Sequence, residues 1–370
     1  MTGQPDHALL VSLPLPLARA WRRVLCTEAP EAVHERAVFA LEAALKFAAA
    51  ASTAAWVTSG AEGSAPQKAC EALVRPSLGH WAAMLRACLG ALPEGDPTRA
   101  WIRAARTRTV TAAVPGLAGG NAGMVLDALP AYRNAVSGHG AGLPSSKAAE
   151  RAPRLVALAR EVLASLVSEE APVLAGRAAG QCVLLTGLSG VPRLLTAGSP
   201  SADLVLSFAG SSTPLCPLWI YDPDWDDVLV LNKGAGLPKV EYLSYGLPHG
   251  ETGLVVRRGM MAEQAARFLE TATGKGALGA RDVAALIEEA EVRALEAQAT
   301  AQRIGPYRVV RQAAKGGQGI LYEAIQEDPP RRVALKVLQL QLAVDEAARR
   351  RFREEGAALA RVEHPGVVPV

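Results

Sequence analysis

Aromatic residues and paired cysteines are scarce in this chain of 370 residues. Only 5% of the residues are aromatic, so we expect hydrophobic cores built from Leu, Val and Ala. The five cysteines are odd in number and widely spaced, and no Cys-x-x-Cys pair occurs. This pattern excludes a disulfide framework and a cysteine-based zinc site, and it predicts reduced, mostly buried thiols.

Long apolar runs and a targeting segment are also missing. Glu42 and Lys46 interrupt the best apolar run, so we expect no membrane span. Asp6 and His7 lie where a secretory signal would need a basic start followed by a smooth apolar core. Together with the unpaired cysteines, these features predict a cytoplasmic protein.

Charge of one sign is not in large excess either. The chain has 39 Lys and Arg against 36 Asp and Glu, a net charge of +3. The surplus falls after Ile304, where 11 basic residues face 8 acidic ones. This balance argues against nucleic acid as a partner of the whole chain. Half of the residues are hydrophobic, which is typical of a globular protein, and the length predicts two or three domains.

Hydrophobic periodicity divides the chain into four parts and predicts a multidomain α+β fold. Residues 1–170 read as a helical bundle, with helices at 18–25, 30–58, 78–92 and 152–167. Residues 171–250 read as a small antiparallel β domain, with strands at 182–186, 204–208, 218–221, 228–231 and 240–243. Residues 251–303 read as a helical linker, with helices at 260–273 and 281–302, and a further domain opens at 304–370.

Two short patterns have simple structural interpretations. Ser77 precedes a helix that starts with His80 and Trp81, and we expect it to cap that helix. Carboxylates at 222, 224 and 226 resemble part of a calcium loop, but the central glycine and the distal glutamate of such a loop are missing. We therefore expect a solvated hairpin turn there.

The strongest functional pattern lies near the end of the chain. A strand leads into a glycine-rich turn with Gly316, Gly317 and Gly319, where backbone amides can approach phosphate oxygens. Seventeen residues after Gly319, Lys336 lies on a later strand and shares a face with Ala334. A small residue can then face an adenine while the ammonium meets the phosphates. Nineteen residues further, Glu355 lies in a helix-length segment and could pair with Lys336.

This segment resembles the N-terminal lobe of bacterial Hanks-type serine/threonine protein kinases. It has the glycine-rich loop, the Val-Ala-x-Lys strand, a helix glutamate and the His-Pro-x-Val-Val entry to the next strand. The resemblance implies that the glycines cover the phosphates of ATP and that Leu321 and Ala334 line the adenine pocket. It also implies that Lys336 contacts the phosphates while paired with Glu355. The fold implied for 304–370 is a sheet plus one helix.

The resemblance covers only about 67 residues. The aspartate of the catalytic loop, the metal-binding asparagine and the aspartate of the Asp-Phe-Gly motif would all lie beyond Val370. We therefore expect this chain to be a truncated part of a longer bacterial signalling kinase, without phosphotransfer activity by itself. Magnesium and protein substrates are expected only with the missing C-terminal lobe.

A second, weaker resemblance concerns Arg133 and His139, which are six residues apart in the helical region. The Arg-Asn-x4-His pattern is similar to that of HEPN-type helical domains, some of which are ribonucleases. The resemblance implies acid–base chemistry by His139 and charge stabilisation by Arg133, at a site usually built across a homodimer. Two alternatives stay open. His139 could simply cap a helix end, or the region could be a non-catalytic interaction module.

Overall fold

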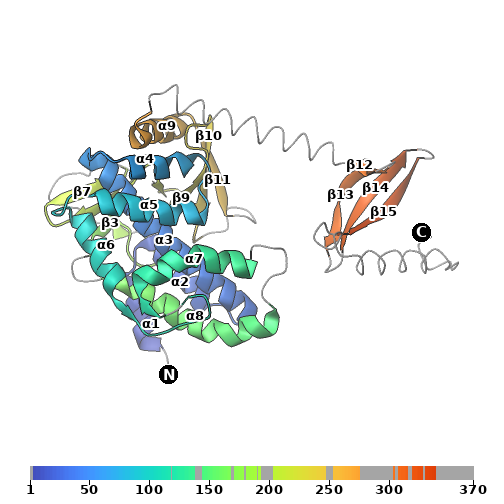
Figure 1. The fold of residues 1–370 in the computed structure, drawn as a ribbon, viewed down its shortest axis with the longest axis horizontal. Coiled ribbons are helices and arrows are strands. Elements are labelled where there is room, and N and C mark those ends of the chain that lie inside the picture. The colour runs from blue at the N-terminus through green and yellow to red at the C-terminus, as the bar shows by residue number, and fades with distance from the viewer. Residues whose placement is uncertain are drawn as a thin grey trace. The chain divides into compact units, whose positions relative to one another are not determined.

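The computed structural model describes residues 3–117, 119–137, 144–167, 171–178, 181–189, 191–192, 203–246, 253–275, 303–304, 307–315, 319–327 and 330–338. The chain divides into two compact units, Met1–Leu286 and Ile287–Val370, which we describe separately (Figure 1). The described elements form a mixed α+β protein whose N-terminal part is helical and whose sheets are antiparallel.

The helices of the first unit include all those predicted in its described part. They are α1 (Gly3–Ser12), α2 (Leu15–Leu25), α3 (Pro30–Ser59), α4 (Ser64–Cys70), α5 (Leu78–Ala91), α6 (Pro97–Thr107), α7 (Ala122–Ser137), α8 (Ser145–Ser165) and α9 (Met260–Thr273), with a 3-10 turn at Glu71–Val74. Ser77 caps α5 as predicted, because its hydroxyl accepts from the His80 amide while the His80 ring accepts from the Ser77 amide. The predicted helix at 281–302 lies outside the described residues.

Helix α3 is the central helix of this unit. From Ala37 to Trp56 every residue is buried except Phe39 and Glu42. Alanine fills much of this stretch, so neighbouring elements approach α3 closely; it packs against α2, α5, α6, α7, α8 and the strand β7 (Ser211–Pro214). A helix that is apolar all round is buried inside a protein or a membrane.

The length and composition of α3 correct one expectation from the sequence. With a mean hydropathy of 1.4 over its most apolar window, α3 is long and apolar enough to cross a membrane, in spite of Glu42 and Lys46. In the structure, however, 89% of that window is buried inside the protein. The packing is therefore that of a core helix.

The described residues of the first unit also form two larger antiparallel sheets. One has the order β5-β4-β3-β6-β7. Besides β7, it contains β3 (Val173–Ala178), β4 (Gln181–Leu184), β5 (Val191–Pro192) and β6 (Leu204–Phe208). The second has the order β11-β10-β9-β8 and contains β8 (Trp219–Asp222), β9 (Asp227–Lys233), β10 (Lys239–Ser244) and β11 (Leu254–Arg258). The predicted hairpin is confirmed as β8–β9. A small ribbon joins β1 (Thr109–Val110) to β2 (Gly120–Asn121).

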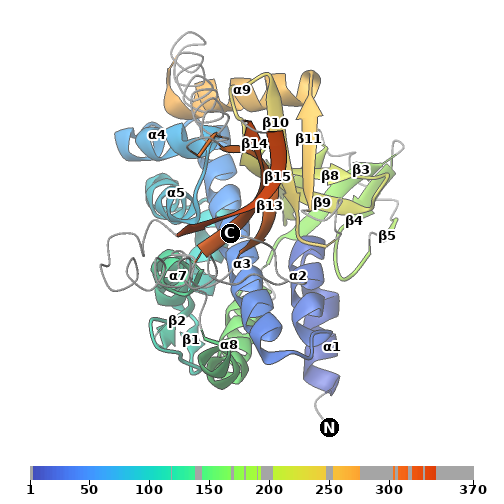
Figure 2. The same cartoon turned by 90° about the vertical axis from the view of Figure 1, so that its right-hand side faces the viewer.

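Aromatic rings join the helices to the second sheet. Phe47 of α3 meets Trp219 of β8 edge-on, with ring centroids 5.5 Å apart, and Trp219 stacks on Tyr245 at 6.0 Å. Helix α9 lies beside β10 and β11 (Figure 2). The helices predicted in 1–170 and the strands predicted in 171–250 thus share one core, and β11 and α9 belong to the same unit.

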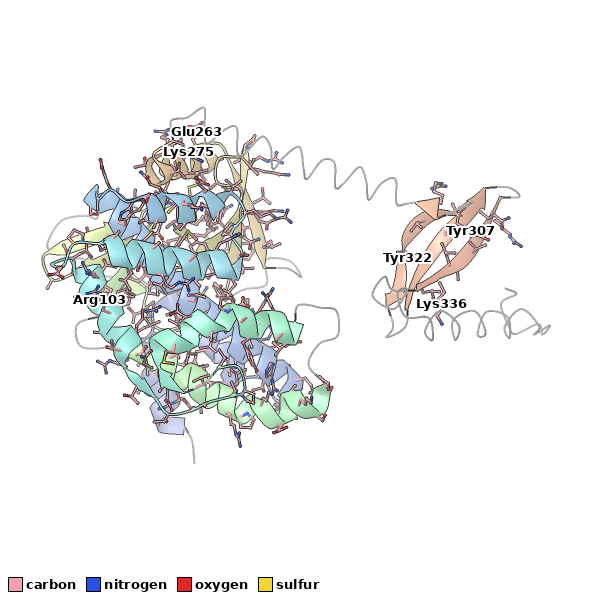
Figure 3. All side chains as sticks on the ribbon, viewed as in Figure 1. Arg103, Glu263, Lys275, Tyr307, Tyr322 and Lys336 are labelled. Carbon is pink, nitrogen blue, oxygen red and sulfur yellow. The ribbon has the colours of Figure 1, made fainter. Side chains whose placement is uncertain are left out.

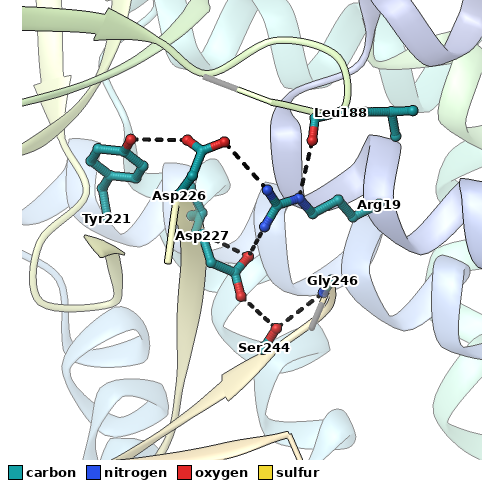
Figure 4. A network of polar contacts seen from close by, with 8 residues as sticks. Arg19, Leu188, Tyr221, Asp226, Asp227, Ser244 and Gly246 are labelled. Atoms are coloured by element: carbon teal, nitrogen blue, oxygen red, sulfur yellow. Dashed lines mark hydrogen bonds and ion pairs between the residues drawn. The ribbon is translucent and has the colours of Figure 1, made fainter. Parts of the chain in front are cut away.

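The turn between β8 and β9 is exposed at Pro223, Asp224 and Trp225, as the sequence predicted, but the carboxylates at its two ends are not solvated. Asp222 is 5% exposed and Asp227 is fully buried. Arg257 pairs with Asp222, and Arg19 of α2 reaches Asp227 (Figure 4). The carboxylates are buried because arginines from distant parts of the chain neutralise them.

The second unit contains one described sheet, with the order β12-β13-β14-β15. Its strands are β12 (Arg303–Ile304), β13 (Tyr307–Lys315), β14 (Gly319–Glu327) and β15 (Pro330–Leu338), each antiparallel to the next. The predicted helix around Glu355 lies outside the described residues.

Candidate functional site

The sheet of the second unit places three predicted site residues on one face. The register of β14 and β15 sets Leu321 directly opposite Lys336 and Glu323 directly opposite Ala334. Residues opposite each other in an antiparallel pair share a face, as do residues two apart in one strand. Leu321, Ala334 and Lys336 therefore form one patch, which we call the lysine face.

The lysine face is open in the described structure. Ala334 and Lys336 are exposed and Leu321 is half-buried. Figure 3 shows Lys336 on β15, with Tyr322 on the neighbouring strand. This face combines a cation, a small side chain and an aliphatic one, which are the chemical elements needed to hold an anion beside a flat apolar group.

The opposite face of the same sheet is apolar around Ala324. Ala324 is fully buried, and Tyr322, Val333 and Leu335 are half-buried on this side. Alternation along β14 and β15 thus separates a packed face from the lysine face. A one-residue slip in register would exchange the two faces, so the buried Ala324 helps to define where Lys336 points.

Polar side-chain contacts also join β14 to β15. Arg332 pairs with Glu323 diagonally across the lysine face, and the Arg331 guanidinium donates to the Gln326 amide oxygen at 2.7 Å. Sequence reasoning did not select Glu323 or Arg332. The two-residue alternation that links Ala334 to Lys336 would also have placed Arg332 on this face.

Of the remaining predicted residues of this site, the structure describes Gly319. Gly316, Gly317 and Glu355 lie outside the described residues, and the backbone of Gly319 opens β14 opposite Leu338. The predicted pairing of Lys336 with Glu355 therefore stays a prediction, as does the contact of the glycines with phosphates.

Arg133, from the second predicted site, lies near the end of α7. Its Nε is 3.4 Å from the Glu42 carboxylate of α3, and its side chain is 48% exposed. His139 lies outside the described residues. The acid–base pair that the sequence suggested stays a prediction.

Titratable groups elsewhere in the described chain do not assemble a metal centre. No cluster of three or more His, Cys, Asp or Glu side chains there could hold a metal ion. All five cysteines are free; Cys70, Cys88 and Cys182 are buried, and Cys26 is exposed.

Comparisons with known proteins point to one family for part of the chain. Serine/threonine-protein kinase PknA of Mycobacterium tuberculosis is 41% identical over 66 residues, which is 18% of this chain and 15% of that protein. A probable serine/threonine-protein kinase of Bifidobacterium longum is 44% identical over 69 residues, covering 18% and 9% of the two chains. PknE of Mycobacterium tuberculosis is 38% identical over 68 residues, covering 18% and 12%.

One region of this chain is kinase-like. The chain spans between 9% and 15% of the length of these curated relatives, so the similarity concerns a short segment only. No family model matches the chain. No solved structure matches it either. None of these comparisons supports the HEPN resemblance.

Proposed function

We propose that the second unit is the ATP-binding part of a serine/threonine protein kinase and that the first unit is its regulatory or sensor region. The observation that carries this proposal is the register of β14 and β15, which gathers Leu321, Ala334 and Lys336 on one exposed face. In the proposed site Leu321 and Ala334 contact the adenine, and the Lys336 ammonium contacts the phosphates.

The residues on the lysine face fit a nucleotide. Ala334 leaves room for a flat base because its side chain is a single methyl group, and Leu321 offers apolar contact beside it. Lys336 is exposed at the same level of the sheet, so its ammonium can reach an anion without disturbing the packed face around Ala324. The glycines at 316, 317 and 319 precede β14 in sequence, where they would cover the phosphates.

Similarity to bacterial kinases supports the same assignment. The matched lengths of 66 to 69 residues are close to the length of the segment from Ile304 to Val370 that carries the kinase motifs. Protein kinases transfer the phosphoryl group with an aspartate base and magnesium ligands from the motifs of a C-terminal lobe. We therefore propose ATP binding, and no later step of the reaction, for the residues described in the second unit.

The test is a titration of the full chain with a fluorescent ATP analogue. Lys336→Met should weaken binding about tenfold or more, because a charge-assisted contact with phosphate is lost. Ala334→Phe should also weaken binding by filling the adenine position. The matched control is Arg331→Met, an exposed cation of the same strand on the opposite face, which should bind like the unmodified chain.

The proposal fails if the unmodified chain does not bind the analogue, or if Lys336→Met and Arg331→Met bind equally well. Circular dichroism of each variant separates lost binding from lost folding.

A further inference from the structure

A cavity of about 540 Å³ lies in the first unit. Helix α3 forms one long wall, α7 and α8 contribute Arg133 and Ala148, and β9 and β10 contribute Asn232 and Leu243. This volume falls within the range of small-molecule binding sites. No function has so far been assigned to the cavity.

Lys46 is the most unusual side chain in the wall of this cavity. The residue is only 8% exposed, and its ammonium lies over the ring of Tyr245, 5.7 Å from the ring centroid. Within the described part of the chain, no hydrogen-bond acceptor or ion-pair partner reaches this ammonium. Burial lowers the pKa of Lys46; the Glu42 carboxylate opposes this shift and Arg133 adds to it.

A largely buried ammonium without an acceptor is costly to the fold, because little water solvates the charge. The hydroxyl of Tyr245, whose ring lies under this ammonium, is also buried and has no partner among the described residues. A ligand that brings an acidic group into the cavity would offset this cost. Lys46 therefore marks the end of the cavity that suits a carboxylate.

The other charged groups of the wall limit the ligand further. Arg133 is already paired with Glu42 at 3.4 Å, and the amide of Asn232 donates to Glu241. Glu31 and Glu35 line the wall two to three turns before Glu42 on α3, and Glu35 is exposed. The wall thus holds two cations and three carboxylates, a balance that repels a polyanion such as a nucleotide and attracts a molecule with charges of both signs.

We propose that this cavity binds a small zwitterion of the amino acid or short-peptide class. Its carboxylate lies against Lys46, and its ammonium lies towards the carboxylates of α3. Phe39, which is half-buried in the cavity wall and 4.7 Å from the Tyr245 ring, offers apolar contact to the part between the two charges. The cavity would make the first unit a sensor for such a molecule.

The test is isothermal titration calorimetry of the full chain with the twenty common amino acids singly, and with glycylglycine and trialanine. For the compound that binds best, the C-terminal amide and the N-acetyl derivative should each bind at least tenfold more weakly. Lys46→Met should reduce binding at least tenfold, whereas Lys68→Met, at an exposed lysine of α4, should not. Lys336→Met should bind like the unmodified chain, which separates this site from the proposed ATP site.

Several results would overturn the proposal. The first is that no tested compound binds at millimolar concentration. The second is that the C-terminal amide binds as tightly as the parent compound, and the third is that Lys46→Met and Lys68→Met bind the compound equally well. Inorganic phosphate that binds more tightly than every zwitterion would also overturn it. The comparison of the parent compound with its amide and N-acetyl derivatives uses the unmodified chain, so it tests the proposal even if Lys46→Met does not fold.

Discussion

The Arg19 guanidinium of α2 lies 2.9 Å from the carboxylate of Asp227 on β9, although the two residues are 208 positions apart. Asp227 is fully buried and also accepts from the Ser244 hydroxyl at 2.5 Å and from the Val228 amide at 2.9 Å. A second, longer contact joins Arg19 to Asp226 at 3.4 Å (Figure 4). This network ties the helical part of the first unit to its second sheet.

Arg19→Met should destabilise the first unit by about 3 kcal/mol, because it leaves the Asp227 charge buried without a cation. Asp226→Asn should cost less than about 1 kcal/mol, since Asp226 is 36% exposed and its contact with Arg19 is longer. Urea denaturation followed by tryptophan fluorescence measures both. Equal losses in the two variants would contradict the central role given to Asp227.

Stability should fall as the pH drops below about 6.5, partly because of His34. This residue is buried and 2.7 Å from the Tyr132 hydroxyl, and burial lowers its pKa, with Arg151 adding to the effect and Glu35 opposing it. The unfolded chain therefore takes up this proton at a higher pH than the folded chain, so protonation favours unfolding. The neutral His34 ring contributes its full stabilisation above the pKa that His34 has in the unfolded chain. This contribution is lost as the pH falls towards the lower pKa that His34 has in the folded chain.

The measurement is the melting temperature between pH 7.5 and 5.5. His34→Gln cannot take up a proton in this range, so its melting temperature should decline less than that of the unmodified chain. His7→Gln is the control, because His7 is exposed in α1. Parallel curves for the unmodified chain and His34→Gln would argue against this assignment.

Thiol reactivity should distinguish Cys26 from Cys216. Cys26 is exposed, whereas burial, with a smaller effect from Asp203, raises the pKa of Cys216 to about 12. At pH 8 only about one Cys216 side chain in ten thousand is then a thiolate, which is the reactive form. Iodoacetamide labelling followed by mass spectrometry should modify Cys26 first, and all five cysteines should react in urea. Fast labelling of Cys216 in the folded chain would show that the packing around it is wrong.

Gly234, in the turn after β9, should not tolerate alanine. Its φ is +99°, and a Cβ atom there would overlap the carbonyl oxygen of Lys239. Gly210 has a similar φ of +90°, but a Cβ atom there would meet nothing within 4 Å. Gly210→Ala should therefore cost about 1 kcal/mol for the backbone conformation alone, and Gly234→Ala about 2 kcal/mol or more. Thermal unfolding of the two variants checks the difference, and a smaller loss for Gly234→Ala would contradict the described turn.

Local sequence patterns predicted much of the secondary structure. Helix α9 has the predicted bounds, and the β8–β9 hairpin lies where alternation and turn residues placed it. Helices α1, α4, α6 and α7 were not predicted. Pro130 lies inside α7, and prolines or glycines flank or interrupt the shorter helices, so their local signals were ambiguous. Packing against α3 and α5 stabilises several of these helices in spite of weak local preference.

The order and spacing of short motifs indicated the kinase-like region. These motifs are visible in the sequence because the conformation of a glycine turn and the position of a lysine on a strand depend on neighbouring residues. What the sequence alone did not determine is the surroundings of single side chains. It presented Lys46 as an interruption in an apolar run and Asp222 as part of a solvated turn. Only the tertiary structure decided that both are buried, because burial depends on which distant elements pack against a residue.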